Sequence, residues 1–187
     1  KTPYKTLINK TLFQRYMQTQ DVKIPKARIA VLIGEKGSVK RRIEKRADVK
    51  LEIDSKEGDV IIEGDSLGVY ETMNVVRAIG RGFNPTVAEL LFNEKYAFEL
   101  IDIVEFTGKS EKKRTRMKGR LIGEDGKSRK YIEKITETHI VVYGKTVALI
   151  GELESVALAK QALEMLLEGS PHSNVFRWLE NKIKFGR

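Results

Sequence analysis

Residues 32–37, Leu-Ile-Gly-Glu-Lys-Gly, return as residues 121–126 in the form Leu-Ile-Gly-Glu-Asp-Gly. An offset of 89 residues aligns the stretches 32–53 and 121–142, and eight of the 22 aligned positions are identical. Beyond these stretches the offset falls to 87, which aligns the glycines at 64 and 82 with those at 151 and 169. Self-similarity at a fixed spacing indicates duplication of a structural unit. The sequence therefore predicts two related domains, each centred on a Gly-x-x-Gly loop.

The composition is that of ordinary globular domains and excludes several chemistries. The chain has 187 residues, of which 41% are hydrophobic and none is cysteine. Disulfide frameworks, thiol catalysis and cysteine-ligated zinc are therefore excluded. No apolar run approaches the roughly 20 residues that a membrane span requires, and no signal peptide opens the chain. We expect a cytoplasmic protein with no membrane partner and no small-molecule substrate.

Positive charge is concentrated around the two loops. Residues 1–50 hold 14 Lys and Arg against 4 Asp and Glu, and residues 109–130 hold 10 against 3, whereas residues 51–108 hold 4 against 12. Charge runs are commonly solvated faces without a partner. Segregation of the cations to both loop regions, in a chain of net charge +9, favours a polyanionic partner instead.

Hydrophobic periodicity predicts the same order of elements in both repeats: strand, helix, helix, strand, strand, helix. In the first repeat, Ser38 is expected to cap the second helix. That repeat is expected to contain a strand at 22–24, helices at 26–33 and 38–47, strands at 49–54 and 60–63, and a third helix that turns Leu67, Tyr70, Met73, Val76 and Ile79 toward the sheet.

The second repeat follows the same plan with a more basic first helix. It is expected to contain a strand at 101–106, a helix from about 112 to 122, a second helix after Gly126, strands at 140–143 and 146–150, and a third helix that turns Val156, Ala159, Leu163 and Leu166 toward its core.

A Gly-x-x-Gly turn between two helices suits the binding of a nucleic-acid strand. Glycine has no Cβ, so the backbone can approach the strand closely. Amides at the start of the following helix point at phosphate, where the helix dipole also favours negative charge. This arrangement resembles that of KH domains, whose loop of this type clamps about four nucleotides of a single strand.

The resemblance to KH domains implies an α+β fold. It consists of two type I KH domains in tandem, each with the order β-α-α-β-β-α and a three-stranded antiparallel sheet packed by three helices. We expect an N-terminal extension at 1–20, KH domain 1 at 21–83, a helical connector at 84–95, KH domain 2 at 96–170 and a C-terminal helix at 171–187.

The candidate RNA-binding residues fall into three groups in each repeat. The loops themselves are Gly34, Glu35, Lys36 and Gly37, then Gly123, Glu124, Asp125 and Gly126. The apolar floor under the bases is expected from Ile29, Ile33, Leu51 and Ile53, then Ile122, Ile140 and Val142. The cations that would meet phosphates are Lys36, Lys40 and Arg41, then Arg120, Lys127, Arg129 and Lys130.

Some residues leave alternatives open. The acidic pair Glu124 and Asp125 could weaken the second loop by repulsion, or the surrounding cations could outweigh it, and we expect both loops to bind. Tyr131 and Tyr143 could stack on bases or be partly buried neighbours, whereas Phe176 and Trp178 are expected to be core or interface anchors. We expect no metal ligands: Asp54, Glu57, Asp59 and Asp65 suit turns, and His139 and His172 stand far apart in sequence.

The chain also resembles archaeal relatives of the Partner-of-NOB proteins, which are tandem KH factors of small-ribosomal-subunit assembly. The likeness is most specific in residues 119–127, in Ile132-Glu133 and in residues 166–175. It implies binding near the 3′ end of small-subunit precursor rRNA, and contact with the PIN-domain endonuclease NOB and other assembly factors. Eukaryotic members are expected to lack the first glycine pair, which is intact here at Gly34 and Gly37.

The sequence therefore favours a non-enzymatic ribosome-biogenesis factor that binds single-stranded rRNA, with no catalytic residue, metal or cofactor. One alternative is an RNA 3′-end nuclease or an exosome-type RNA-binding subunit. Another is a mainly protein-binding scaffold of the related Krr type, for which the apolar connector and tail helix would supply surface.

Overall fold

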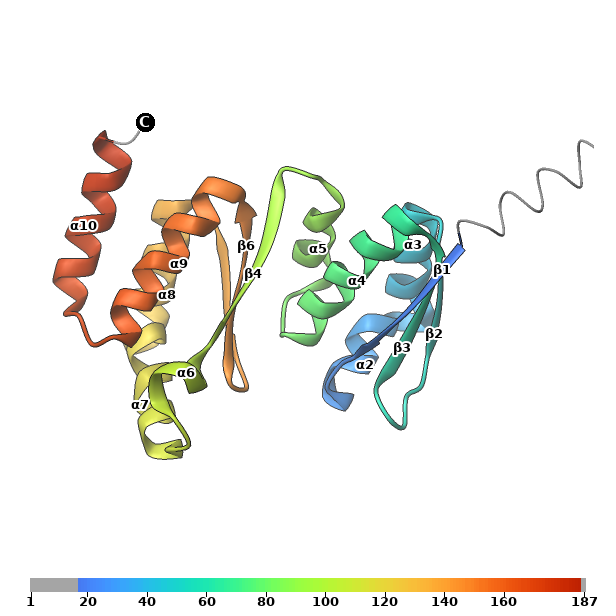
Figure 1. Cartoon of the computed structure of the whole chain (residues 1–187), viewed down its shortest axis with the longest axis horizontal. Coiled ribbons are helices and arrows are strands. Elements are labelled where there is room, and N and C mark those ends of the chain that lie inside the picture. The colour runs from blue at the N-terminus through green and yellow to red at the C-terminus, as the bar shows by residue number, and fades with distance from the viewer. Residues whose placement is uncertain (1–16, 186–187) are drawn as a thin grey trace, which may run out of the picture. The chain divides into compact units, whose positions relative to one another are not determined.

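The computed structural model describes residues 17–185, which fall in two compact units, residues 17–92 and residues 93–185 (Figure 1). Each unit contains one sheet of three antiparallel strands with helices packed on one face. The third strand in sequence lies at the centre of each sheet, in the orders β1-β3-β2 and β4-β6-β5. This confirms the predicted α+β class and the duplicated strand and helix order.

The first unit includes the predicted connector as far as Phe92. Its elements are β1 (Met17–Lys23), α2 (Lys26–Ile33), η1 (Glu35–Gly37), α3 (Ser38–Ala47), β2 (Lys50–Ile53), β3 (Asp59–Asp65), α4 (Ser66–Gly80), α5 (Pro85–Ala88) and η2 (Glu89–Phe92).

Among the residues that the structure describes, the second unit has one more long helix than the first. Its elements are β4 (Tyr96–Asp102), α6 (Ile103–Thr107), α7 (Glu111–Ile122), η3 (Glu124–Gly126), α8 (Lys127–Thr136), β5 (His139–Tyr143), β6 (Thr146–Glu152), α9 (Leu153–Leu167) and α10 (His172–Phe185).

The cores lie between each sheet and its helices. In the first unit, Leu51 and Ile62 from the sheet are fully buried together with Leu32 and Ile43 from the helices. In the second unit, the core extends under α10 through Val175 and Leu179. The predicted core-facing residues of α9 are also buried: Val156, Ala159, Leu163 and Leu166.

The predicted core face of α4 was wrong in its first turns. Leu67 is 66% exposed and Tyr70 is 60% exposed, whereas Val69, Thr72 and Val76 are buried. Asp65 explains the phase, because its side chain accepts a hydrogen bond from the Gly68 amide at 2.7 Å and starts the helix at Ser66. The inward stripe therefore begins at Gly68 and Val69.

Other boundaries also differ from the predictions. Strand β1 begins at Met17, inside the stretch expected to be an extension, whereas residues 1–16 lie outside the described part of the chain. Residues 103–107 form helix α6 rather than a strand, because Asp102 caps it through the Val104 amide at 2.8 Å. Ser38 is the first residue of α3 and does not cap it; the N-cap position is Gly37.

The connector packs on the first unit through a buried carboxylate. Glu89 in η2 is 7% exposed and receives hydrogen bonds from Arg42 of α3, with Nε 2.9 Å from each carboxylate oxygen and Nη2 2.6 Å from Oε1. The hydrogen bond to Glu89 raises the pKa of Arg42 above its ordinary value. One turn on, the Arg46 guanidinium lies 5.0 Å from the centre of the Phe92 ring. Two arginines of the basic block are therefore structural.

We predict that Arg42→Met lowers the free energy of unfolding by about 2 kcal/mol, because the buried Glu89 carboxylate loses its partner. Urea denaturation followed by circular dichroism measures the loss. Lys45→Met is the matched control, since Lys45 is an exposed cation on the same helix. Equal losses in the two variants would contradict a structural role for the Arg42 contact.

Candidate nucleic-acid interface

The first loop (residues 34–37) and the second loop (residues 123–126) have the same backbone conformation. Their first glycines have φ/ψ of 72°/174° and 71°/175°. The third positions, Lys36 and Asp125, are left-handed at 49°/29° and 52°/24°, and the last glycines follow at 77°/19° and 76°/13°. The lysine and the aspartate thus occupy the same unusual geometry. The exchange between them changes the charge of the loop but not its path.

The two glycines of each loop have different roles. A Cβ on Gly34 would lie 2.8 Å from the Val39 amide nitrogen, and one on Gly123 would lie 2.8 Å from that of Ser128. Their φ/ψ region is also open essentially only to glycine. At Gly37 a Cβ would meet only the mobile end of the Arg41 side chain, at 3.1 Å. The first glycine therefore allows the following helix to pack closely against the loop. The last glycine has no backbone neighbour at this distance and leaves space on the outer face of the loop.

Both loops lead directly into helices whose first turns have no side-chain cap. The N-cap residues of α3 and α8 are the last glycines of the loops, and neither helix receives a side-chain hydrogen bond there. The first amides of a helix need acceptors from outside the helix. The amides of Ser38 and Lys127 already donate to the carbonyl oxygens of Glu35 and Glu124 within the loops. A phosphate at this position would therefore be favoured mainly by the helix dipole.

The predicted apolar floor separates into core and surface residues. Ile29, Leu51 and Ile140 are 4%, 0% and 1% exposed, so they belong to the core. The other members remain partly exposed and can contact a ligand: Ile33, Ile53, Ile122 and Val142. In the second unit, α7 and α8 both pack against β5. Ile122 at the end of α7 and Val142 in β5 therefore belong to neighbouring elements.

A carboxylate that the sequence analysis did not select holds this arrangement together in both units. Glu44 accepts a hydrogen bond from the Leu51 amide at 2.9 Å, and Glu133 accepts one from the Ile140 amide at 2.7 Å. Each also approaches the cation four residues earlier: Lys40 at 3.8 Å and Arg129 at 3.9 Å. The identity of Glu44 and Glu133 in the aligned repeats was the available signal. They tie the helix after the loop to its strand.

The predicted cations divide in the same way. Lys36 and Arg41 are exposed beside the first loop. Lys127 is exposed beside the second loop and lies 3.5 Å from Glu124, so it partly offsets the charge of one of the two loop carboxylates. Lys130 lies over the loop with Nζ 3.4 Å from the Asp125 carbonyl oxygen. Arg129 donates to the Ile140 carbonyl oxygen at 3.1 Å and is partly committed.

The structure gives Arg120 a different role from the predicted phosphate contact. Its guanidinium donates to the carbonyl oxygens of Leu166 at 3.3 Å and Ser170 at 2.7 Å, at the end of α9. In the first unit, Arg28 donates in the same way to the carbonyl oxygens of Ile79 and Phe83 at 2.8 and 2.6 Å. These acceptors are equivalent at the offset of 87 residues. Arg28 and Arg120 are not at equivalent positions in the aligned repeats. An alignment of the repeats residue by residue therefore does not reveal that the two arginines make the same contact.

The acidic residues weighed as nuclease ligands have other contacts. Asp54 accepts from the amides of Lys56 and Glu57 in a turn, Asp59 pairs with Lys23 at 3.0 Å, and Asp65 caps α4. Across residues 17–185, no group of three or more His, Cys, Asp or Glu side chains is arranged to hold a metal ion. Within the same residues, no helix is long and apolar enough to cross a membrane.

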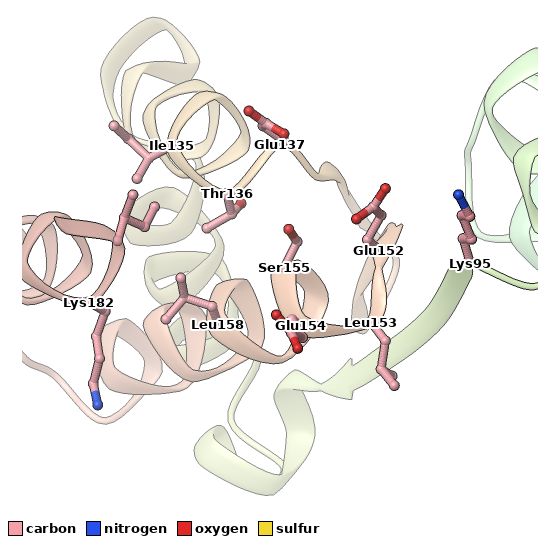
Figure 2. A pocket seen from close by; sticks show the side chains of 11 residues that line it. Lys95, Ile135, Thr136, Glu137, Glu152, Leu153, Glu154, Ser155, Leu158 and Lys182 are labelled. Atoms are coloured by element: carbon pink, nitrogen blue, oxygen red, sulfur yellow. The ribbon is translucent and has the colours of Figure 1, made fainter. Parts of the chain in front are cut away.

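A pocket of about 840 Å³ lies at the end of α8 away from the second loop. Figure 2 shows the side chains of Glu137, Glu152 and Glu154 around it, with Ile135 and Leu158 as apolar neighbours. Lys95 and Lys182 also line the pocket but do not outnumber its carboxylates. This acidic lining does not suit a phosphate backbone. The loops, not this pocket, are the candidate nucleic-acid site.

The different roles of the loop glycines predict different costs of adding a methyl group. Gly34→Ala should lower the free energy of unfolding by roughly 3 kcal/mol, because the backbone region excludes alanine and the Cβ meets the Val39 amide. Gly37→Ala should cost only about 1 kcal/mol, since the Arg41 side chain can move aside. Urea denaturation compares the two variants. A larger loss for Gly37→Ala would contradict this assignment.

Comparisons with known proteins agree with this geometry. Family profiles match residues 19–78 as a KH domain and residues 97–184 as a eukaryotic-type KH domain of type I. A KH domain-containing protein of Methanocaldococcus jannaschii is 49% identical over 174 residues, which cover 89% of this chain and 76% of that protein. The RNA-binding protein pno1 of Dictyostelium discoideum is 27% identical over 168 residues, 85% of this chain and 69% of that protein.

Solved structures extend the likeness to three dimensions. Dim2p from Pyrococcus horikoshii is 44% identical, with a TM-score of 0.81 over 88% of this chain and 99% of that one. The complex of a/eIF2α, aDim2p and rRNA from the same organism contains a chain that is 44% identical, with a TM-score of 0.84 over 90% of this chain and 96% of that one. These matches confirm the resemblance to the Partner-of-NOB proteins, and the chain belongs to the family of tandem KH-domain proteins that includes PNO1 and Dim2.

Proposed function

We propose that this protein is a non-catalytic ribosome-biogenesis factor that holds single-stranded small-subunit rRNA, or its precursor, near the 3′ end. The first and second loops grip the phosphates, and the partly exposed apolar residues beside them contact the bases. The observation that carries the proposal is the matching backbone of the two loops, each followed by a helix without a side-chain cap.

The relatives support rRNA as the ligand. Several carry names such as pre-rRNA-processing protein PNO1, from Candida albicans and Schizosaccharomyces pombe, and one solved neighbour is a complex with rRNA. The exposed cations at both loops suit a ligand with a phosphate backbone. Because assembly of small subunits would be the setting of this activity, we place it in the cytoplasm.

The protein acts by binding rather than by chemistry. The carboxylates that a two-metal nuclease would need are committed to a turn, a salt bridge and a helix cap instead. A partner must therefore carry out any cleavage, and the family name points to the PIN-domain endonuclease NOB. Incubation of the purified protein with labelled RNA and Mg²⁺ tests this part. RNA cleavage that Asp54→Asn or Asp59→Asn removes would overturn it.

Both loops contribute in this proposal. The second loop keeps its geometry despite two acidic residues, and Lys127 offsets one of them. Two weak sites on one strand raise the apparent affinity through effective concentration, provided that the strand reaches both. Loss of one loop should therefore weaken binding without abolishing it.

Charge reversal at each loop tests the proposal. Lys36→Glu with Arg41→Glu, or Lys127→Glu with Lys130→Glu, should each weaken binding of single-stranded RNA about tenfold, because charged hydrogen bonds to phosphate are lost. The dependence of affinity on salt should also become shallower by about 0.7 in log–log slope for each lost phosphate contact. Fluorescence anisotropy with a labelled RNA of the 3′-terminal small-subunit sequence measures both quantities.

Lys45→Glu and Lys134→Glu, combined in one variant, are the matched controls, because they change the net charge by the same amount as a loop variant and these exposed lysines occupy equivalent positions away from the loops. They should change the affinity much less than the loop variants. If loop and control variants weakened the affinity equally, the net charge of the protein alone would explain RNA binding, and the loops would have no specific role. Unchanged affinity in both loop variants would favour the protein-binding scaffold.

A further inference from the structure

A second pocket lies beside the second loop, on the side of α8 that faces the C-terminal helix. It has a volume of about 330 Å³, within the range of small-ligand sites. Two of its residues come from the loop and three from the first turns of α8, and α10 closes it. The lining residues are Gly123, Glu124, Lys127, Ser128, Tyr131, His172 and Phe176.

Three contacts fix α10 in the position that closes the pocket. His172 Nε2 lies 2.8 Å from the carbonyl oxygen of Arg120, and the Arg120 guanidinium holds the preceding turn at Ser170. The Tyr131 hydroxyl donates a hydrogen bond to Glu180, and this bond raises the pKa of Tyr131 to about 12. Tyr131 therefore stays protonated at neutral pH, and α10 is a built wall of the pocket.

The walls are aromatic and one polar atom in them has no partner. The rings of Tyr131 and Phe176 lie 4.3 Å apart at an interplanar angle of 38°, and His172 meets Phe176 edge-on at 5.9 Å. Ser128 is 4% exposed, and its Oγ has no hydrogen-bond partner among the described residues. A buried hydroxyl without a hydrogen-bond partner destabilises the fold unless a water molecule or a ligand supplies the missing hydrogen bond. The pocket thus has two packed aromatic rings in its lining, and the buried Ser128 hydroxyl without a partner lies behind its surface.

The same face of the equivalent helix carries different residues in the first unit. At the offset of 89, Ser128 and Tyr131 correspond to Val39 and Arg42. Val39 has no polar atom to offer, and Arg42 is held by Glu89 of the connector. The duplication therefore produced two loops of one conformation whose neighbouring helix faces differ. Only one of these faces carries the aromatic set.

We infer that this pocket receives one unstacked nucleobase of an RNA strand whose phosphates lie on the second loop. The inference rests on the proposed function and extends it beyond the loops. Every base has a flat face that stacks on aromatic rings, and bases next to a clamped backbone are the RNA groups within reach of these walls. A phosphate fits less well, because three of the seven lining residues carry rings and the Glu124 carboxylate also lines the pocket.

Phe176→Leu tests the inference, because it removes the ring while keeping an apolar side chain against the core. Binding of the full chain to single-stranded RNAs of four to twelve nucleotides should weaken about tenfold for the longer RNAs and stay unchanged for the shortest, which fills only the groove at the loop. In wild-type protein, a 2-aminopurine scanned along the longest RNA should show stacking at one position that is lost in the variant. Phe185→Leu is the matched control, since this exposed ring lies on α10 outside the pocket.

The outcomes separate the inference from the proposed function. If Phe176→Leu binds every RNA as tightly as wild type while the Lys127→Glu, Lys130→Glu variant binds weakly, the pocket is not a base site and the proposed function stands. If wild-type protein binds none of the RNAs, the proposed function itself fails. A thermal melt shows whether weaker RNA binding by Phe176→Leu is caused by unfolding of the variant. If it is, the 2-aminopurine scan with wild-type protein is the test. A scan in which no position of the RNA shows stacking would overturn the inference.

Discussion

The structure depends on one close approach, between the first glycine of each loop and the amide at the start of the next helix. A Cβ at Gly34 or Gly123 would lie 2.8 Å from that amide nitrogen, so only glycine lets the two helices meet at this angle. The constraint explains why the loops share a backbone conformation although Lys36 in one is replaced by Asp125 in the other. The last glycine of each loop, which is half-buried, occupies the N-cap position of α3 or α8, so neither helix has a side-chain cap.

The high positive charge of the chain serves two purposes. Arg28 and Arg120 hold the ends of α4 and α9 through carbonyl oxygens, and Arg42 anchors the connector through a buried carboxylate. These arginines are bound in fixed, multidentate contacts, which suit a planar guanidinium. The exposed cations at the loops are mainly lysines on flexible stems, which suit a mobile phosphate backbone. Net charge alone would not have distinguished the two groups.

The repeat and its periodicity predicted most of the fold, because glycine placement and apolar spacing are local properties. Helices α2 and α3 and both hairpins follow the pattern within one or two residues. The predictions that failed have two causes: helix caps that were not recognised, and tertiary packing. Leu67 and Tyr70 have helical spacing but point outward because Asp65 sets the phase of α4, and Asp102 converts the predicted strand end into α6. The role of Arg120 and the burial of three of the seven predicted floor residues, by contrast, depend on tertiary packing, which local sequence does not give.

The central claim is that both loops bind the backbone of one single-stranded RNA. The most direct measurement is a titration of the ¹⁵N-labelled protein with single-stranded RNA, followed by the amide resonances of Gly37, Ser38, Gly126 and Lys127. The account predicts that both sets shift, whereas amides at the far ends of α3 and α8 do not. Shifts confined to one loop would remove the other from the interface, and shifts in neither would contradict the account.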